Sequence, residues 1–469
     1  MTSDAIDVKR GVRQGGVTSS FLYLTFMNDL LEELTSSKLG ASVDSIQCGN
    51  PTLADDVTLV AISPANLQSM LNIVSDFASR YKFEINRSKS WVLSFSCKSS
   101  SVPLSVMYND QLLDHVQSST HLGMILSSNM KTEPKITKRC QKGKNSFHAM
   151  IGYGVHPSGL NPLTSSSLYK KVILPTILYG SELWNNMTNK DIITLNKTQH
   201  YIVKSIQGFP TQTRSDICES MLGLYRLSSE VDKRKLIFLH KLLSLPHESI
   251  AKSIFMRRYL KKLQHPNYVC KGFIPDIARI LSKYQLAHIL NEYMNNNTMP
   301  SKYTWKKLVK TTVHTKELSL WNSRLQTDRD YERFKHIHTS VRPSVLWTFP
   351  SNRRDLALSH RIAQLWISRP DTDISVCPHC EQIFTDKLRH ITADCLLTLR
   401  LKHEFIDNMC TVYNCTEHIN DNDSEKFLQF LMGGCAAENE NNDNPNELIY
   451  QSFSYIQSCL NLYHRSLDI

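Results

Sequence analysis

Two adjacent carboxylates, Asp55 and Asp56, directly precede an apolar run at 57–62. The pattern predicts a β-hairpin with the acids at its tip, because side chains alternate along a strand and both acids reach solvent only where the chain turns. Like charges this close raise each other's pKa unless a cation neutralises them. Mg²⁺ is a suitable cation, since it favours one or two carboxylates together with substrate phosphates. The alternative is a solvated turn, where aspartate is common.

A second set of residues has the spacing of a metal site. Cys377, Cys380, His390 and Cys395 form the pattern C-x2-C-x9-H-x4-C. Closed Cys₃His sites of this kind hold structural Zn²⁺, with no position left for water. The spacing therefore predicts a zinc knuckle, against the alternative of four incidental residues. His379 is a spare ligand candidate, although it lies inside the first Cys–Cys pair.

A glycine-rich turn and a helix precede the acidic pair. Gly15 and its neighbours allow close backbone approach to another molecule, and Arg13 and Gln14 between them are donors for phosphate or base. A plain turn with a surface arginine is the alternative. The helix expected at 19–34 has an apolar stripe that we predict to be core. Its members are Leu24, Met27, Leu31 and Leu34.

Further elements follow the hairpin. A helix is predicted to begin at Pro64, which suits the first helical position, and a turn at 86–89 precedes a second strand. Asn109 and Asp110 predict another hairpin turn, and 121–126 is expected to be one strand. Lys89, in the turn, is either a surface lysine or a group that approaches phosphate.

In order and spacing, these motifs resemble those of the palm of reverse transcriptases, in particular the reverse transcriptases of non-LTR (LINE-type) retrotransposons. The resemblance continues into a thumb-region signature and the Cys/His cluster, while the middle of the chain matches loosely. It rests on the segments RGVRQGG at 10–16, LADD at 53–56, FEINRSKS at 83–90, THLGM at 120–124 and YGSELW at 179–184. The chain departs from the family's usual pattern at 18–20, which reads TSS where Leu-Ser-Pro is usual, and at Leu53, where an aromatic is usual.

The resemblance implies RNA-directed DNA synthesis. Asp55 and Asp56 would hold Mg²⁺, Arg13, Gln14 and Gly15 would contact template or nucleotide, and Lys89 would approach phosphate. The implied partners are an RNA template, a DNA primer or target and, if the chain is active, deoxynucleoside triphosphates. The knuckle would help bind the RNA of the element or its target DNA.

Two-metal nucleotidyl transfer needs carboxylates from two separate strands. In the family one aspartate comes from well upstream of the glycine-rich turn, and this sequence begins just before that turn. We therefore expect an N-terminally truncated polymerase with an incomplete two-metal site, weakly active or inactive alone, and leave open whether it is an enzyme. The alternative is a catalytically dead, zinc-containing nucleic-acid-binding remnant. A metal-dependent nuclease is a poor fit, because no further carboxylate stands in a suitable motif.

Composition agrees with a nucleic-acid partner. The 469 residues carry a formal net charge of +11 with a pI of about 9.0, which favours a polyanion. No run of 18 apolar residues and no signal peptide is evident, so we expect an intracellular protein, in nucleus or cytoplasm, that does not engage the membrane. The twelve cysteines are expected to be reduced thiols, some of them metal ligands.

The predicted fold class is α+β: a partial right-hand polymerase palm of hairpins and helices, then a mostly helical thumb and C-terminal region with a small zinc knuckle. A basic helix expected near 131–144 suits phosphate contacts or a solvated face. The segment KYTWKK at 302–307 suits stacking with single-stranded nucleic acid, or equally a helical core with a charged shell. The predicted parts are a palm at 1–127, a thumb-like helical region at 128–225, a basic helical region at 226–350, the knuckle at 351–400 and a helical tail at 401–469 with a disordered loop at 436–447.

Overall fold

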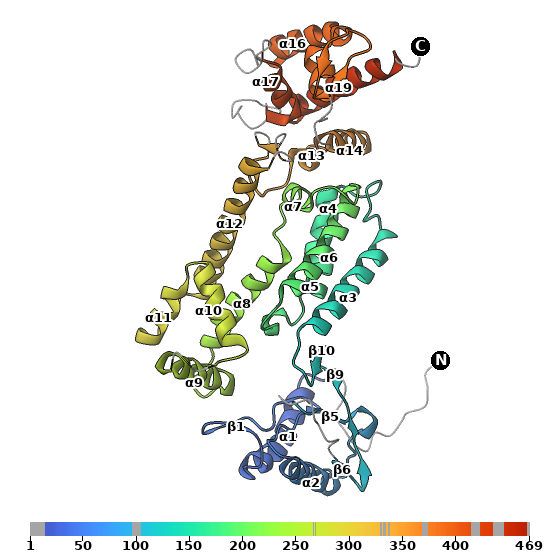
Figure 1. Ribbon diagram of the computed structural model, residues 1–469. Coiled ribbons are helices and arrows are strands. Elements are labelled where there is room, and N and C mark those ends of the chain that lie inside the picture. The colour runs from blue at the N-terminus through green and yellow to red at the C-terminus, as the bar shows by residue number, and fades with distance from the viewer. Residues whose placement is uncertain are drawn as a thin grey trace, which may run out of the picture. The chain divides into compact units, whose positions relative to one another are not determined.

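The computed structural model is drawn in Figure 1. It describes residues 15–95, 105–265, 267, 269–328, 331, 334–335, 338–367, 374–413, 423–434 and 445–466. Helices predominate within these ranges, and every sheet found there has two strands. The predicted mixture of helices and small sheets is therefore confirmed. Arg13, Gln14 and most of the loop expected at 436–447 lie outside the described residues.

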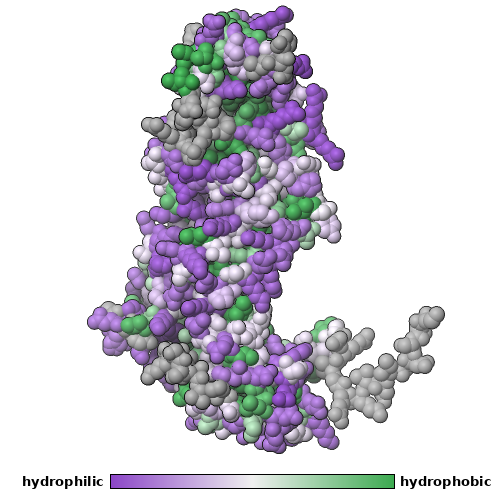
Figure 2. Space-filling view, turned by 45° about the vertical axis from the view of Figure 1, so that its right-hand side comes forward, coloured by the Kyte–Doolittle hydropathy of each residue, from purple (hydrophilic) through white to green (hydrophobic). Residues whose placement is uncertain are grey.

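The chain divides into two compact units, each made of two separate stretches. Unit 1 contains the described residues of 1–135 and 239–278, and unit 2 those of 136–238 and 279–469. None of the described helices combines the length and apolarity that a bilayer crossing requires. In Figure 2 hydrophilic residues cover much of the visible face, and hydrophobic ones lie between them in small patches.

Unit 1 contains helices and short strand pairs. Its helices are α1 (Ser19–Ser36), α2 (Pro64–Tyr81), the 3₁₀ turn η1 (Arg87–Lys89) and α9 (Ile250–Gln264). Its strands are β1 (Ser42–Val43), β2 (Ile46–Gln47), β3 (Thr52–Leu53), β4 (Asp56–Val57), β5 (Trp91–Val92), β6 (Met107–Tyr108), β7 (Gln111–Leu112), β8 (Asp114–His115), β9 (Ser118–His121) and β10 (Met124–Ser127). β5 and β8 pair in parallel, and the other pairs are antiparallel hairpins.

Helices α1 and α2 pack against each other and form the main core of unit 1. Met27, Leu30 and Leu34 of α1 are buried there together with Met70, Val74 and Phe77 of α2. The predicted stripe on α1 is therefore partly wrong: Leu24 is 55% exposed and Leu31 is only partly buried, whereas Leu30 is buried. The periodicity of leucines alone did not decide which of two adjacent rows faces α2.

Two hairpin turns in unit 1 use left-handed backbone. Asn109 and Asp110 have φ of 48° and 57° between β6 and β7, which confirms the predicted hairpin turn and is typical of a type I′ turn. The single strand predicted at 121–126 is wrong. Leu122 and Gly123 have φ of 48° and 74°, and they reverse the chain between β9 and β10.

The regular structure in the described part of unit 2 is helical, apart from the β11–β12 hairpin and an isolated bridge between Leu222 and Pro343. Its α-helices include α3 (Glu133–Ile151, in this unit from Ile136), α4 (Pro162–Leu168), α5 (Leu174–Ile177), α6 (Asn189–Gln207), α7 (Ser215–Met221), α8 (Leu227–Leu243), α10 (Phe273–Lys283), α11 (Ala287–Asn296), α12 (Lys302–Thr327), α13 (Val345–Thr348), α14 (Arg353–Ile367), α15 (Lys387–Arg389), α16 (Leu399–Tyr413), α17 (Ser424–Gln429) and α19 (Pro445–Arg465); α8 and α10 contribute residues to both units. The remaining elements are the π-helices η2 (Tyr169–Ile173), η5 (His390–Asp394) and η7 (Phe430–Gly434), the 3₁₀ turns η3 (Ser181–Leu183) and η6 (Leu396–Thr398), and the strands β11 (Ser375–Val376) and β12 (Ile383–Phe384).

The segment 179–184 has a packing role in unit 2. Trp184 is buried, and its backbone carbonyl accepts a hydrogen bond from the ammonium group of Lys235, which is itself only 1% exposed. Arg234 donates to the Leu178 carbonyl at 3.2 Å and lies 3.7 Å from Glu182. Helix α8 therefore fixes this segment through backbone carbonyls.

The close approach of α3 to α5 requires a glycine. A Cβ atom on Gly143 would lie 2.3 Å from Cγ1 of Ile177, far inside van der Waals contact. We expect Gly143→Ala to lower the free energy of unfolding by about 1–3 kcal/mol through overpacking, measured by denaturant melts. Gly152→Ala is the control, because no atom lies within 4 Å of its Cβ position. Equal effects of the two substitutions would contradict this packing argument.

His338 is buried in unit 2, and burial lowers its pKa to about 4. Between pH 4 and 6.5 the unfolded chain then binds a proton that the folded chain excludes. Stability should therefore fall as pH drops through this window, by roughly 3 kcal/mol in all. We expect His338→Gln to flatten the dependence of unfolding free energy on pH, with exposed His265→Gln as control. An unchanged slope in His338→Gln would show that another group causes the loss.

Candidate functional site

Asp55 and Asp56 lie at the tip of the β3–β4 hairpin. Leu53 pairs with Asp56 in register, so Ala54 and Asp55 form the two-residue connection. Both carboxylates are exposed, and the predicted hairpin with acids at its tip is confirmed. Ala54 has a φ of 52°, a left-handed conformation that is unfavourable for a residue with a Cβ atom. The turn thus holds two like charges on a strained backbone.

The chain after the hairpin is anchored to the core of unit 1. Val57, Leu59 and Ala61 alternate inward and pack against the α1–α2 cluster, as strand geometry requires. Between them, Thr58 Oγ1 lies 3.5 Å from Nε2 of His121 in β9. These contacts leave the turn itself free of packing partners in the core.

A glycine crossing supports the base of the hairpin. The N–H of Val60 donates to the Gly49 carbonyl at 2.6 Å, and the N–H of Ala41 donates to the Val60 carbonyl at 2.7 Å. A Cβ on Gly49 would lie 2.4 Å from Cα of Gly40. The two backbone segments therefore approach each other more closely than side chains would allow.

The electrostatics of the turn reach α1. The pKa of Tyr23 is raised by burial and, to a smaller extent, by the negative charge of Asp55. Within the part of the chain that the structure describes, no third His, Cys, Asp or Glu joins Asp55 and Asp56 in a ligand cluster. Two exposed, adjacent carboxylates fit one hard cation, and they supply only part of a two-metal site.

Of the other residues predicted for this site, the structure describes Gly15 and Lys89. Gly15 is exposed, with a φ of 77° in the turn before α1. Lys89 is exposed at the end of η1, and no hydrogen bond or ion pair between described residues joins it to Asp55 or Asp56. Their roles, like those of Arg13 and Gln14, stay predictions.

The four residues of the predicted knuckle come together in unit 2. The ligand atoms of Cys377, Cys380, His390 and Cys395 all lie within 4.8 Å of one another. Three of these residues are buried and Cys380 is partly buried. Cys377 directly follows β11, and the β11–β12 hairpin turns around Cys380. The sequence spacing therefore predicted a real spatial cluster.

A π-helix explains the spacing of the second ligand pair. His390 is the first residue of η5, and Cys395 follows its last residue. The N–H of Cys395 donates to the His390 carbonyl at 2.8 Å, which is the i to i+5 bond of a π-turn. Residues five apart on such a turn lie on the same side, so the x4 spacing lets the imidazole and the thiol share one site.

The first ligand pair is shaped by a tight loop. The N–H of Cys377 donates to the Gln382 carbonyl at 2.9 Å, and Glu381 turns the chain with a φ of 60°. Burial acts to raise the pKa of the Cys377 thiol, but the backbone N–H groups of His379 and Cys380 and the His390 ring lower it to about 6. Burial raises the pKa of Cys395 to about 12. Cys377 therefore favours the thiolate form in which cysteine binds metal, whereas Cys395 favours the neutral thiol.

The distances within the cluster fit a tetrahedral zinc ion. Sγ atoms bound about 2.3 Å from Zn²⁺ at tetrahedral angles lie ~3.8 Å apart. The Sγ atoms of Cys377 and Cys395 are 3.8 Å apart, and those of Cys395 and Cys380 are 4.0 Å apart. Nε2 of His390 lies 3.4 Å from Sγ of Cys380. The donor set and its size both suit a closed structural site.

His379 is not part of the cluster. Its Nε2 lies 3.2 Å from Oγ of Ser466, and its ring meets Tyr463 edge-on at 4.9 Å. His390 instead stacks on Phe384 with ring centroids 4.6 Å apart. The structure thus separates His390, which lies in the cluster, from His379, which does not. Through His379, the loop that carries Cys377 and Cys380 contacts the C-terminal helix α19.

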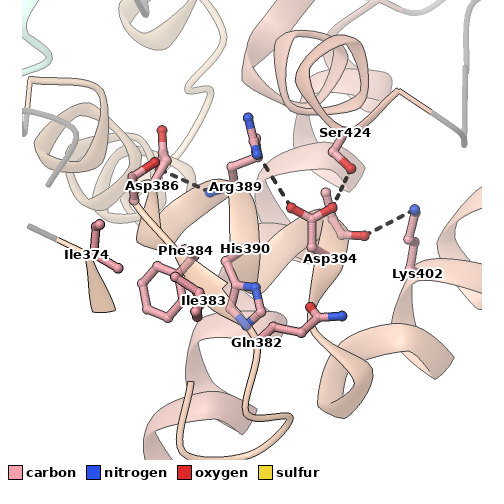
Figure 3. Close-up of a pocket in the computed structure, with 12 residues that line it drawn as sticks. Ile374, Gln382, Ile383, Phe384, Asp386, Arg389, His390, Asp394, Lys402 and Ser424 are labelled. Carbon is pink, nitrogen blue, oxygen red and sulfur yellow. Dashed lines mark hydrogen bonds and ion pairs between the residues drawn. The ribbon is translucent and has the colours of Figure 1, made fainter. Parts of the chain in front are cut away.

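A pocket opens beside the knuckle (Figure 3). Its volume is about 660 Å³. The side chains of Ile374, Ile383 and Phe384 lie toward one side, and Arg389 and Asp394 lie toward the other. Asp394 accepts a hydrogen bond from Ser424 and lies 3.5 Å from Arg389. Apart from His390, the lining residues have no motif spacing, so no sequence pattern predicts this pocket.

Comparison with known proteins agrees with these features. Residues 2–126 match the family model described as reverse transcriptase (RNA-dependent DNA polymerase), and the chain is similar to reverse transcriptases of retrotransposons. A curated relative, the probable RNA-directed DNA polymerase from transposon X-element of Drosophila melanogaster, is 23% identical over 236 residues, which are 48% of this chain. The chain spans about a quarter of that relative, as the aligned part is 25% of its length. No solved structure matches the chain significantly.

The knuckle predicts a specific metal requirement. We expect purified chain to contain about one zinc ion, measured by inductively coupled plasma mass spectrometry, and His390→Gln to lose it. Chelation should lower the melting temperature, because metal binding contributes directly to folding. His379→Gln is the matched control and should keep the metal. Retention of zinc by His390→Gln, or its loss from His379→Gln, would contradict the ligand assignment.

Proposed function

We propose that this chain takes part in RNA-templated DNA synthesis as a portion of a non-LTR retroelement reverse transcriptase. The observation that carries the proposal is the exposed Asp55–Asp56 pair at a hairpin tip, within residues that match the reverse transcriptase family. The partners are an RNA template, a DNA primer or target and deoxynucleoside triphosphates. The proposed parts are the palm at 1–127, the thumb-like region at 128–225, the basic region at 226–350, the knuckle at 351–400 and the tail at 401–469.

The proposed chemistry at the hairpin is metal binding. Bound Mg²⁺ would neutralise charge on the transferred phosphoryl group and orient it. Asp55 and Asp56 hold the cation because they are exposed, adjacent and acidic. Arg13, Gln14 and Gly15 contact template or nucleotide, and Lys89 approaches phosphate as a mobile cation.

The small number of clustered carboxylates in the described residues supports low polymerase activity of the chain alone. Two-metal catalysis needs a ligand set that clamps both ions, about 4 Å apart, and Asp55 and Asp56 have no third partner there. This observation favours a second candidate function, namely a zinc-containing nucleic-acid-binding protein without polymerase activity. Both functions place the chain inside the cell.

The Cys₃His cluster is proposed to hold structural Zn²⁺ in either case. Its four ligands would order the β11–β12 hairpin and η5 as one knuckle that contacts the RNA of the element or its target DNA. The ligand geometry supports the metal, and the net charge of +11 supports the polyanion.

Primer extension tests the proposed polymerase function. The full chain is incubated with an RNA template, an annealed DNA primer, deoxynucleoside triphosphates and Mg²⁺, and products are resolved on a gel. We expect extension to be weak or absent, and any extension to fall at least tenfold in Asp55→Asn and in Asp56→Asn, because each substitution removes a metal-binding charge. Asp110→Asn, in an exposed turn of the same unit, is the control.

The outcomes separate the two functions. Extension that both aspartate variants lose, and that Asp110→Asn keeps, establishes the polymerase. No extension, with binding of the template–primer retained and weakened by salt, establishes the nucleic-acid-binding protein. Extension that survives in Asp55→Asn and Asp56→Asn would refute the assigned role of the pair.

A further inference from the structure

The N-terminal half of α12 presents a cationic and aromatic face. Lys302, Lys306 and Lys310 recur every four residues and lie on one row of the helix. Tyr303 and Lys307 form the neighbouring row. All five residues are exposed, Tyr303 by 78%. We call these five residues the α12 basic face; α12 is the long helix labelled above α11 in Figure 1.

The structure divides the sequence motif KYTWKK into a core part and a surface part. Trp305 is 1% exposed, and its indole N–H donates to the Leu236 carbonyl at 2.9 Å. It is therefore a packing residue and cannot stack on a ligand. Tyr303 points away from that core and keeps its ring in solvent. Of the two interpretations left open by the sequence, the helical core applies to Trp305, and a surface suited to stacking applies to Tyr303.

The opposite side of α12 holds the helix rigidly. Its buried stripe recurs every four residues: Trp305, Val309, Val313, Glu317, Trp321 and Leu325. Glu317 accepts a hydrogen bond from Ser229 at 2.7 Å, and the Trp321 indole donates to the His338 carbonyl at 2.9 Å. The α12 basic face is therefore a preorganised array, which lowers the cost of binding.

The charge of this face is not neutralised. No acidic residue occurs from Lys302 to Lys316 in the sequence. Among the described residues, none of the lysines of the α12 basic face forms an ion pair, whereas exposed Arg80, Arg257 and Arg400 each pair with an acid. Like charges four residues apart destabilise a helix, and so do cations in the first turn, near the positive end of the helix dipole. Helix stability does not account for this arrangement, and a polyanionic ligand does.

The dimensions suit a nucleic-acid strand. The lysine row advances by about 6 Å per step and ~12 Å in all, given the rise of the helix. A tyrosine ring beside such a row offers a stacking surface to an unpaired base, which a duplex keeps inside its base stack. The combination of phosphate contacts and an exposed ring favours a single strand.

We propose that the α12 basic face binds single-stranded nucleic acid, with Lys302, Lys306 and Lys310 on successive phosphates and Tyr303 stacked on a base. The inference rests on the proposed function only in that the chain handles nucleic acid. It adds a contact surface in unit 2 that neither the metal-binding hairpin nor the knuckle provides.

The test is fluorescence anisotropy of the full chain with a labelled single-stranded RNA of about 20 nucleotides, longer than a typical single-strand site, at several salt concentrations. The triple variant K302Q/K306Q/K310Q should bind at least tenfold more weakly near 0.1 M salt, and its slope of log affinity against log salt should shrink by about 2. Tyr303→Ala should bind about 5- to 100-fold more weakly with an unchanged slope, and Tyr303→Phe should bind like the unmodified chain.

The matched control is R80Q/R257Q/R400Q, which removes the same charge from arginines already paired with Glu33, Asp44 and Glu404. It should change affinity less than threefold.

Melting curves confirm that each variant folds. Equal losses in the two triple variants would overturn the inference, as would unchanged binding by K302Q/K306Q/K310Q, and in both cases the proposed function would stand. Tighter binding to duplex with no effect of Tyr303→Ala would overturn the single-strand assignment. Failure of the unmodified chain to bind any strand would refute the proposed function as well.

Discussion

The side chains of the Cys₃His cluster, three of them buried, set the strongest constraint on the C-terminal part of the protein. Two of them, Cys377 and Cys395, belong to the same apolar cluster as Phe453, Tyr455 and Tyr463 of α19. The Tyr463 hydroxyl even lies 3.9 Å from Sγ of Cys377. Structural zinc in small sites contributes about 10–16 kcal/mol, as much as the whole stability of a typical domain. Zinc in the proposed knuckle would therefore stabilise the packing of α19 as well.

The acidic hairpin follows the opposite principle. Its two carboxylates are held out in solvent by a strained turn, and burial stops at Val57. Among the described residues no ion pair compensates their charge, and a bound cation, as proposed above, would do so. In the proposed sites, burial would let the knuckle gain stability from its metal, whereas exposure would keep the metal of the hairpin exchangeable. The α12 basic face resembles the hairpin, because its lysines are exposed and form no ion pair with any described residue.

Local sequence signals predicted those features that depend on neighbours in the chain. The hairpin at Asp55, the turn at Asn109 and the clustering of Cys377 with His390 all follow from short spacings. The prediction for α1 was partly wrong because it depends on tertiary contact. Leu24 belongs to the predicted apolar stripe, but α1 carries a second apolar row that includes Leu30, and only packing against α2 selects between the two rows. Leu122 in a left-handed turn has no sequence signal, since its side chain disfavours that backbone.

The site shows the same limit. The sequence identified the four residues that cluster in the structure, but it did not distinguish His379 from His390 by anything except spacing. The π-turn that makes the x4 interval work became visible only in the backbone hydrogen bonds of η5. Likewise, KYTWKK had two interpretations until Trp305 proved buried. Residues that line the pocket beside the knuckle, such as Asp394 and Ser424, come together from distant elements, so no local pattern marks them.

The interleaving of the two units has a consequence for how the protein is made. Unit 1 draws residues from 239–278, after more than a hundred residues that belong to unit 2. A nascent chain folds in the order in which it leaves the ribosome. The hairpin and its helices must therefore wait, with α9 still unsynthesised, while α3 to α7 emerge and begin to pack. Long-range closure of this kind is slow, so unit 1 is the part that is exposed longest to chaperones and proteases during synthesis.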